Sequence, residues 1–401
     1  MGNPIDGKGA LRASKSSGLF NPAPGIMARS MLNEQLASGV PAVDMFFPIV
    51  LGQRIAILGD SKSGKSTFLR QLSANQKGTD RIVVYAMIGK RKVDIEGLLS
   101  GLEESGAMDH TIVVVADIFD SLTQSYLAPY AACAMAEELW HNGHDVIIIY
   151  DDLSSHAEAY RQLSLFQEVD PGRDSYPGDM FYAHSSLLER AGKLADSNKT
   201  LTSLPVVITP NDDITAYLST SIMSITDGQI FLETALFYQG VRPAISVGLS
   251  VSRVGSSAQT KAIKAVGGGL KLSLAQFREL AAFSQFSTDL DPETRQIIER
   301  GQRLTEILKQ PQYSPYALWE MYVLLLAATS GSFDSVPVDK INLALEALLF
   351  ELKSKVPKLI DKLNTGDKPI ETDTKVITDI ASAIGKSYVS TKDHSKESKE
   401  S

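Results

Sequence analysis

Short apolar runs alternate with segments of helical spacing over about the first 250 residues of the chain. The runs are rich in Val and Ile and nearly free of charge, which is typical of strands buried on both faces. The predicted strands span residues 55–58, 81–88, 111–116, 145–150, 204–209 and 245–251. The predicted helices between them span residues 68–72, 93–104, 126–141, 153–166 and 181–195. This alternation predicts an α/β domain with a mostly parallel sheet that helices cover on both faces.

The pattern changes on both sides of this region. Residues 1–45 are rich in Gly, Pro and Ser and predict an irregular lead-in packed on a domain that spans residues 46–257. Within that domain, Asp227-Gly228 lies between two apolar runs and predicts a hairpin. Residues 258–390 predict an all-helical second domain, and residues 391–401, mostly Lys, Ser and Glu, predict a disordered tail. The predicted helices of the second domain span residues 270–286, 292–308, 315–328, 338–355 and 376–388.

Composition narrows the class of protein. With 43% hydrophobic and 21% charged residues, the 401-residue chain is that of an ordinary protein with a real core. The net charge of −8 argues against a large nucleic-acid interface. The single cysteine, Cys133, excludes intrachain disulfides and fits a small buried apolar side chain better than a reactive thiol. No apolar run reaches the ~18 residues of a membrane span, and the N-terminus lacks a signal-peptide core.

One stretch carries a phosphate-binding pattern. Residues 59–66 match G-x-x-x-x-G-K-[ST], and they stand between a predicted strand and a predicted helix, as this motif requires. Glycines allow the backbone to approach the phosphates, the lysine reaches the β- and γ-phosphates, and the final hydroxyl ligates Mg²⁺. The alternative is an ordinary glycine-rich turn. The residues predicted to contact the nucleotide are Gly59, Asp60, Ser61, Lys62, Ser63, Gly64, Lys65, Ser66 and Thr67.

An acidic pair ends the fourth predicted strand. Asp151 follows the apolar run 146–150, where a carboxylate is expected to orient Mg²⁺ through water, with Asp152 as the alternate. The two carboxylates can instead cap the next helix.

Twelve stretches together resemble the alpha subunit of F-type ATP synthase. They follow one another in collinear order from about residue 3 to about residue 388. Beta subunits and other relatives of this family lack most of them, which makes the resemblance specific. The stretches are residues 4–9, 59–66, 127–135, 149–154, 171–173, 176–179, 184–190, 224–234, 250–255, 258–261, 279–286 and 308–313.

The resemblance implies a RecA-like P-loop domain followed by a helical domain, in the regulatory, nucleotide-binding alpha subunit of a rotary proton-translocating ATP synthase. Such subunits bind ATP or ADP with Mg²⁺ and turn it over little. They alternate with beta subunits in a hexamer around the gamma shaft, and the delta subunit of the stator and the membrane sector are indirect partners. With nothing like a transit peptide in the sequence, the expected location is the cytoplasmic face of a bacterial membrane.

The resemblance also assigns roles to single residues. Arg253 is expected to be an arginine finger that reaches the catalytic site of the beta subunit, and Ser250 is expected to be needed for coupling. Gln310 and Gln312 match residues beside the adenine, and residues 283–291 match the loop that touches the shaft. For Arg173, in a glycine-proline loop at the subunit boundary, only a structural role is expected.

Several positions depart from the family. Catalytic relatives carry a Glu after the second strand and alpha subunits usually a Gln, whereas this chain has Lys90, which cannot act as a general base at neutral pH. Lys62 replaces the usual Gln and Ser66 the usual Thr, and residues 219–221 also differ. The family's N-terminal β-barrel has no counterpart in this sequence. Three interpretations are open: the chain is a fragment, translation starts late, or the chain is a specialised paralogue. Two alternative functions remain: a self-sufficient hexameric ATPase motor, and a degenerate structural protein.

Overall fold

The computed structural model describes residues 2–11, 15–284 and 291–389. The chain divides into two compact units, and each is described by itself. The first consists of Met1–Ser38, Phe47–Tyr238 and Ala244–Ala258, and the second of Gly39–Phe46, Gln239–Pro243 and Gln259–Ser401. The predicted tail, residues 391–401, lies outside the described residues.

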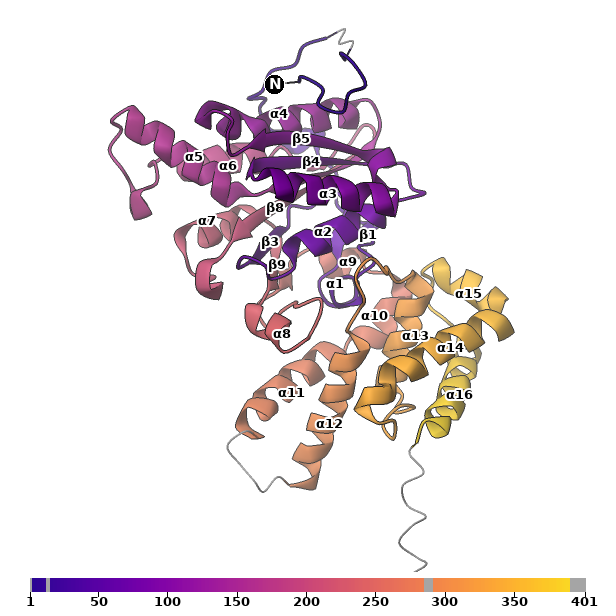
Figure 1. Cartoon of the computed structure of the whole chain (residues 1–401). Helices are drawn as coiled ribbons and strands as arrows, with labels where there is room; N and C mark the ends of the chain where they lie inside the picture. The colour runs from indigo at the N-terminus through magenta and orange to yellow at the C-terminus, as the bar shows by residue number, and fades with distance from the viewer. Residues whose placement is uncertain (1, 12–14, 285–290, 390–401) are drawn as a thin grey trace, which may run out of the picture. The chain divides into compact units, whose positions relative to one another are not determined.

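A mostly parallel sheet forms the centre of the first unit (Figure 1). Its strands run in the order β10-β9-β3-β8-β6-β4-β5, and β7 pairs with β8. Only β10 and β7 pair antiparallel with their neighbours in this sheet. The strands are β3 (Ala56–Gly59), β4 (Arg81–Lys90), β5 (Thr111–Asp117), β6 (Asp145–Asp151), β7 (Gly192–Lys193), β8 (Thr200–Ile208), β9 (Gly228–Leu232) and β10 (Val251–Ser252). The predicted α/β fold with a mostly parallel sheet is therefore confirmed.

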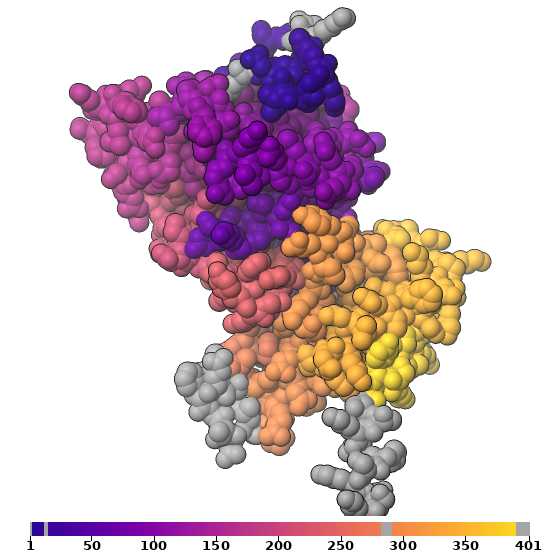
Figure 2. All heavy atoms as spheres, in the orientation of Figure 1, coloured from indigo at the N-terminus to yellow at the C-terminus, as the bar shows by residue number. Residues whose placement is uncertain are grey.

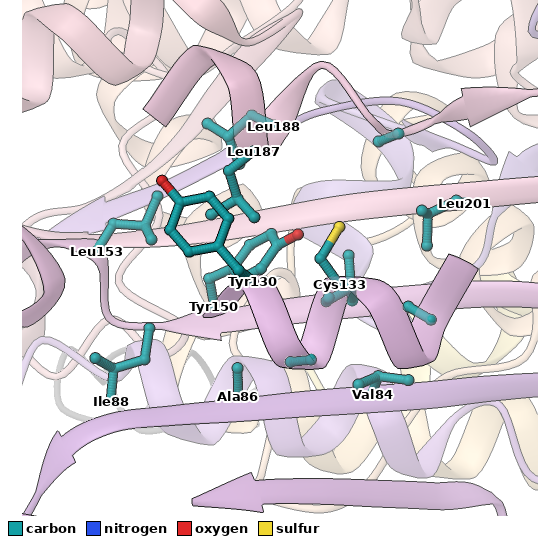
Figure 3. Close-up of a cluster of buried hydrophobic side chains, with 14 of the residues drawn as sticks. Val84, Ala86, Ile88, Tyr130, Cys133, Tyr150, Leu153, Leu187, Leu188 and Leu201 are labelled. Atoms are coloured by element: carbon teal, nitrogen blue, oxygen red, sulfur yellow. The ribbon is translucent and has the colours of Figure 1, made fainter. Parts of the chain in front are cut away.

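Helices cover the two faces of this sheet. In Figure 1, α4 lies on one side of β4 and β5, and α2 and α3 lie on the other. Alternate residues of the strands therefore face different helices, and Val84, Ala86 and Ile88 of β4 pack with Tyr130 and Cys133 of α4 (Figure 3). The helices are α2 (Lys65–Ala74), α3 (Lys92–Ser105), α4 (Leu122–His141), α5 (Leu153–Phe166), α6 (Met180–Leu188), α7 (Tyr217–Ile225), α8 (Thr234–Tyr238) and α9 (Gly255–Ala258).

Cys133 lies in this core and is 1% exposed. Burial raises the pKa of its thiol to about 12, so the thiol stays protonated at neutral pH. The sequence-based interpretation of a small buried apolar side chain is confirmed.

Two predicted strand regions in the first unit are wrong, and the helix predicted at residues 181–195 ends at Leu188, before β7. Residues before Asp227 form helix α7 rather than a strand, so no hairpin forms at Asp227-Gly228, and β9 pairs parallel with β3. The predicted strand at residues 245–251 is reduced to the short β10 and one isolated bridge between Leu232 and Ile245. In both places an apolar run is buried without extending the sheet, because apolar periodicity reports burial and not pairing.

The lead-in is less irregular than predicted. It contains a turn of 3-10 helix at Ile26–Ala28 and a strand β1 (Gln35–Leu36) that pairs antiparallel with β2 (Ile49–Val50). Helix α1 (Pro41–Phe46) belongs to the second unit. The residues nearest the N-terminus, in indigo in Figure 2, lie on the surface of the first unit.

The second unit is helical, as predicted. Its central helix is α13, in which Trp319 and the continuous run 321–327 are buried. Three of its helices, α1, α10 and α15, were not predicted because they are short. Its helices are α1, α10 (Lys261–Gly267), α11 (Leu270–Ser284), α12 (Pro292–Ile307), α13 (Leu318–Thr329), α14 (Ile341–Lys355), α15 (Pro357–Asn364) and α16 (Glu371–Ser387). Among the described residues of the whole chain, no helix has the length and apolar character needed to cross a membrane.

A buried histidine pair lies between α5 and α6. The Nδ1 of His156 is 3.2 Å from the Nε2 of His184, and the Nε2 of His156 is 3.1 Å from the carbonyl oxygen of Tyr126. Burial lowers the pKa of His156 to about 4 and that of His184 well below its ordinary value. Both rings are therefore neutral in the folded protein and gain a proton near pH 6.5 only after unfolding.

We expect the first unit to lose stability as the pH falls from 6.5 towards 4, because the unfolded state then binds protons that the folded state excludes. For His156 alone the loss is about 2 kcal/mol between pH 7 and pH 5. Thermal melts at the two pH values should show a smaller loss for the double variant His156→Gln/His184→Gln than for the wild type. An equal loss in both proteins would contradict this assignment.

Candidate functional site

The phosphate-binding pattern forms a loop between β3 and α2. Gly59 ends β3, and a Cβ there would lie 2.6 Å from the carbonyl oxygen of Leu232 and 2.6 Å from the hydroxyl of Ser63. Gly64 is the N-cap of α2 with φ 103°, a left-handed conformation that favours glycine. The two glycines thus let the chain turn sharply and direct the N-terminus of a ten-residue helix at the loop.

Lys65 lies inside this loop. Its Nζ donates to the carbonyl oxygens of Gly59 at 2.8 Å and Asp60 at 2.7 Å. Burial lowers its pKa to about 8, although the nearby charges of Asp152 and Asp151 oppose the shift. The ammonium is held by neutral carbonyl groups, so an incoming phosphate can exchange for them without breaking a direct ion pair.

Most of the rest of the loop is open to solvent. Ser61, Lys62 and Ser66 are exposed. Thr67 is half-buried and Ser63 is buried. Asp60 shapes the loop because its carboxylate accepts hydrogen bonds from the N–H groups of Ser61 at 2.6 Å and Asn211 at 2.8 Å. All the predicted loop residues are therefore in one continuous structure, with exposed hydroxyl and amino groups on its outer side.

A second group of polar side chains lies at the same edge of the sheet. Asp151 ends β6 and pairs in register with Met87 of β4, close to Lys90 at the end of β4. The Nζ of Lys90 is 2.6 Å from Oδ1 of Asp151 and 2.6 Å from Oδ2 of Asp152. The hydroxyl of Tyr85 donates to the other oxygen of Asp151 at 3.1 Å. One ammonium group thus bridges two carboxylates beside the loop.

The sequence predicts neither the ion pair of Asp152 with Lys90 nor the hydrogen bond of Tyr85 to Asp151. Asp152 does cap the next helix, as the alternative interpretation expects, because its Oδ1 accepts a hydrogen bond from the N–H of Ser155 at 2.6 Å. Its other oxygen binds Lys90. The sequence signal for Tyr85 is a single hydroxyl group within an otherwise apolar predicted strand.

These residues, as they stand, do not fit a resident magnesium ion. Ser66 is exposed and offers its hydroxyl, but Asp151 is only 6% exposed and already neutralised by Lys90. A divalent cation at Asp151 would have to displace that ammonium or lie beside it. The magnesium assignment for Ser66 and Asp151 stays a prediction.

The residues assigned to catalysis lie elsewhere in the first unit. Arg253 follows β10 and is exposed; its backbone N–H donates to the carbonyl of Asp227 at 3.0 Å and its Nη1 to that of Thr226 at 3.4 Å. Within the described part of the chain, its guanidinium has no carboxylate partner, because Asp227 binds Arg54 at 2.9 Å. Ser250 is 1% exposed, and its hydroxyl accepts the N–H of Phe231 at 3.0 Å.

Arg253 and the phosphate-binding loop are at opposite edges of the sheet. Ser252 pairs with Gly228 at the start of β9, whereas Gly59 pairs with Leu232 at the end of β9. Four residues of strand separate these positions by about 13 Å along β9. Arg253 extends from the far edge, away from this chain's own loop.

Three other predicted features have mixed outcomes. The side-chain amide of Gln310, in the second unit, donates to the carbonyls of Gly39 and Ser314 at 2.8 and 2.6 Å, while Gln312 is exposed. The adenine contact of both glutamines stays a prediction. The guanidinium of Arg173 lies 5.5 Å from the ring centroid of Tyr217, which fits a structural role. Most of the expected shaft loop, residues 285–290, lies outside the described residues.

Each of the two units matches a known protein-family model. Residues 39–252 match the family model described as ATP synthase alpha/beta family, nucleotide-binding domain. Residues 259–384 match that of the ATP synthase alpha/beta chain, C terminal domain. The first match covers the loop, the acidic pair, Lys90 and Ser250, and ends one residue before Arg253.

Proposed function

This chain belongs to the ATP synthase alpha/beta family, and we propose that it is the regulatory, nucleotide-binding alpha subunit of a rotary proton-translocating ATP synthase. It binds ATP or ADP at residues 59–67 and lends Arg253 to the catalytic site of a neighbouring beta subunit. The hexamer that it forms with beta subunits surrounds the gamma shaft and connects through the delta subunit of the stator to the membrane sector. It is peripheral, on the cytoplasmic face of a bacterial membrane.

The ion pairs of Lys90 carry this proposal. Hydrolysis needs a group that accepts or orients a proton of the attacking water. The carboxylates beside the loop, Asp151 and Asp152, are both bound by Lys90 at 2.6 Å. Lys90 itself stays protonated, because the charges of these carboxylates raise its pKa even though burial opposes the shift. The site is therefore built to hold a nucleotide and is poorly equipped to hydrolyse it.

The position of Arg253 supports the proposal that it acts on the catalytic site of a neighbouring beta subunit. An arginine that serves this chain's own loop would have to extend from the carboxyl edge of the sheet. Arg253 is exposed at the opposite edge and has no carboxylate partner among the described residues. A free guanidinium in that place is suited to a site on a neighbouring subunit, where it stabilises charge on the transferring phosphoryl group.

ATP binding and ATP turnover, measured together, test the proposal. The purified chain should bind ATP without turning it over, and adding a matching beta subunit should produce turnover. Brisk turnover by this chain alone would overturn the proposal in favour of a self-sufficient ATPase motor. Binding without turnover in the mixture would overturn it in favour of a structural paralogue or a fragment that does not assemble.

A further inference from the structure

We propose that the Lys90 ammonium takes the place of a divalent cation in this site, so that the chain binds ATP without magnesium. The inference rests on the nucleotide binding proposed above and specifies the ion requirement of that same site. It is carried by the contacts of Lys90 with the carboxylates of Asp151 and Asp152.

The first argument is that every carboxylate oxygen already has a donor. Lys90 binds Oδ1 of Asp151 and Oδ2 of Asp152, each at 2.6 Å. The two remaining oxygens accept the hydroxyl of Tyr85 at 3.1 Å and the N–H of Ser155 at 2.6 Å. Each of the four oxygens therefore has a donor. A metal ion, or water bound to it, has to compete with these donors for the same oxygens.

The second argument is charge. The carboxylates of Asp151 and Asp152 bind the ammonium of Lys90, and the charges of Asp152, Asp151, Lys90 and Asp60 all act on Lys65. The two ammonium groups thus offset the charges of Asp151 and Asp152 before any ion arrives, and Asp60 adds one further carboxylate on the loop. A divalent cation added beside Lys90 meets a like charge in a buried setting, since the Lys90 side chain is 18% exposed and those of Asp151 and Asp152 are 9% and 1% exposed. Like charges that lie close together repel strongly where water is largely excluded.

The third argument is the consequence for the phosphates. In most such sites the metal offsets repulsion between the triphosphate and nearby carboxylates. Lys90 already offsets the charge of Asp151 and Asp152, so free ATP meets a loop with the cation Lys65 and no uncompensated anion from this pair. Removing the Lys90 charge would expose two buried carboxylates, which repel phosphate and attract a divalent ion.

The test is ATP binding by the purified full chain, measured by calorimetry in excess magnesium chloride and in EDTA. We expect the wild-type dissociation constant to change by no more than about threefold, or ~0.7 kcal/mol. In Lys90→Gln the affinity should fall by about tenfold or more in EDTA and recover in magnesium. The matched control is Lys92→Gln, which removes an exposed lysine that pairs with Glu96 on α3 and should behave as the wild type.

Each outcome bears on the inference. A wild-type chain that binds ATP in magnesium and loses tenfold or more in EDTA would overturn it while leaving the proposed function intact. A wild-type chain that binds ATP under neither condition would overturn both. If Lys90→Gln does not fold, the wild-type comparison between magnesium and EDTA still decides.

Discussion

Replacing Arg253 with alanine should lower ATP turnover of the assembled alpha–beta complex by about 10³–10⁵-fold, the contribution of an arginine finger in other nucleotide hydrolases. ATP binding by this chain should not change, because Arg253 is at the edge of the sheet opposite the phosphate-binding loop. The fold should also survive, since the guanidinium is exposed and makes only a 3.4 Å contact with a backbone carbonyl.

Two further variants sharpen this test. Arg253→Lys keeps the charge and loses the fork of N–H donors, so most of the turnover should still be lost. Arg300→Ala removes an exposed arginine that pairs with Asp334 in the second unit and should leave turnover unchanged. Normal turnover of the Arg253→Ala complex would contradict the assignment. A loss of ATP binding by the variant chain would instead show that Arg253 acts on this chain's own site.

Replacing Arg190 with methionine should destabilise the first unit by about 3–5 kcal/mol, the usual result of breaking a buried ion pair from one side. Arg190 is 1% exposed, and its Nε donates to Oε1 of Glu137 at 2.6 Å, while its Nη2 binds the other carboxylate oxygen. The variant leaves Glu137, 6% exposed, without its cation.

The same pair holds the lead-in on the first unit. Nη1 of Arg190 donates to the carbonyl oxygen of Leu19 at 2.7 Å, and the side chain of Asn21 donates to Glu137 at 2.8 Å. Limited proteolysis should therefore cut the variant near residues 19–21 faster than the wild type. Protection of the lead-in equal to that of the wild type would contradict this role.

Urea unfolding of matched variants measures how much the Arg190–Glu137 ion pair changes the free energy of unfolding. The double variant Arg190→Met/Glu137→Leu should recover much of the lost stability, because no uncompensated charge remains buried. Arg91→Met, which breaks an exposed pair with Asp94, should show no measurable change. If Arg190→Met were as stable as the wild type, the buried pair would not be the anchor of the lead-in.

The fold class and the phosphate-binding loop could be predicted from the amino-acid sequence. Five of the predicted strands are strands of the sheet, because their apolar β-branched runs must be buried and local propensity agrees with that burial. The loop is a local structure, in which the two glycines and Lys65 are close in the chain, so their spacing alone specifies their geometry. Helical spacing likewise indicated the second unit.

The side chains that lie beside the loop could not be predicted, because long-range strand pairing brings them there. Lys90 and the acidic pair are about sixty residues apart in the chain and meet because β4 and β6 are adjacent, parallel and in register at Met87 and Asp151. The antiparallel pairing of β10 likewise places Arg253 at the edge away from the loop. Strand order and register depend on contacts between distant segments, and the pattern within one segment does not contain them.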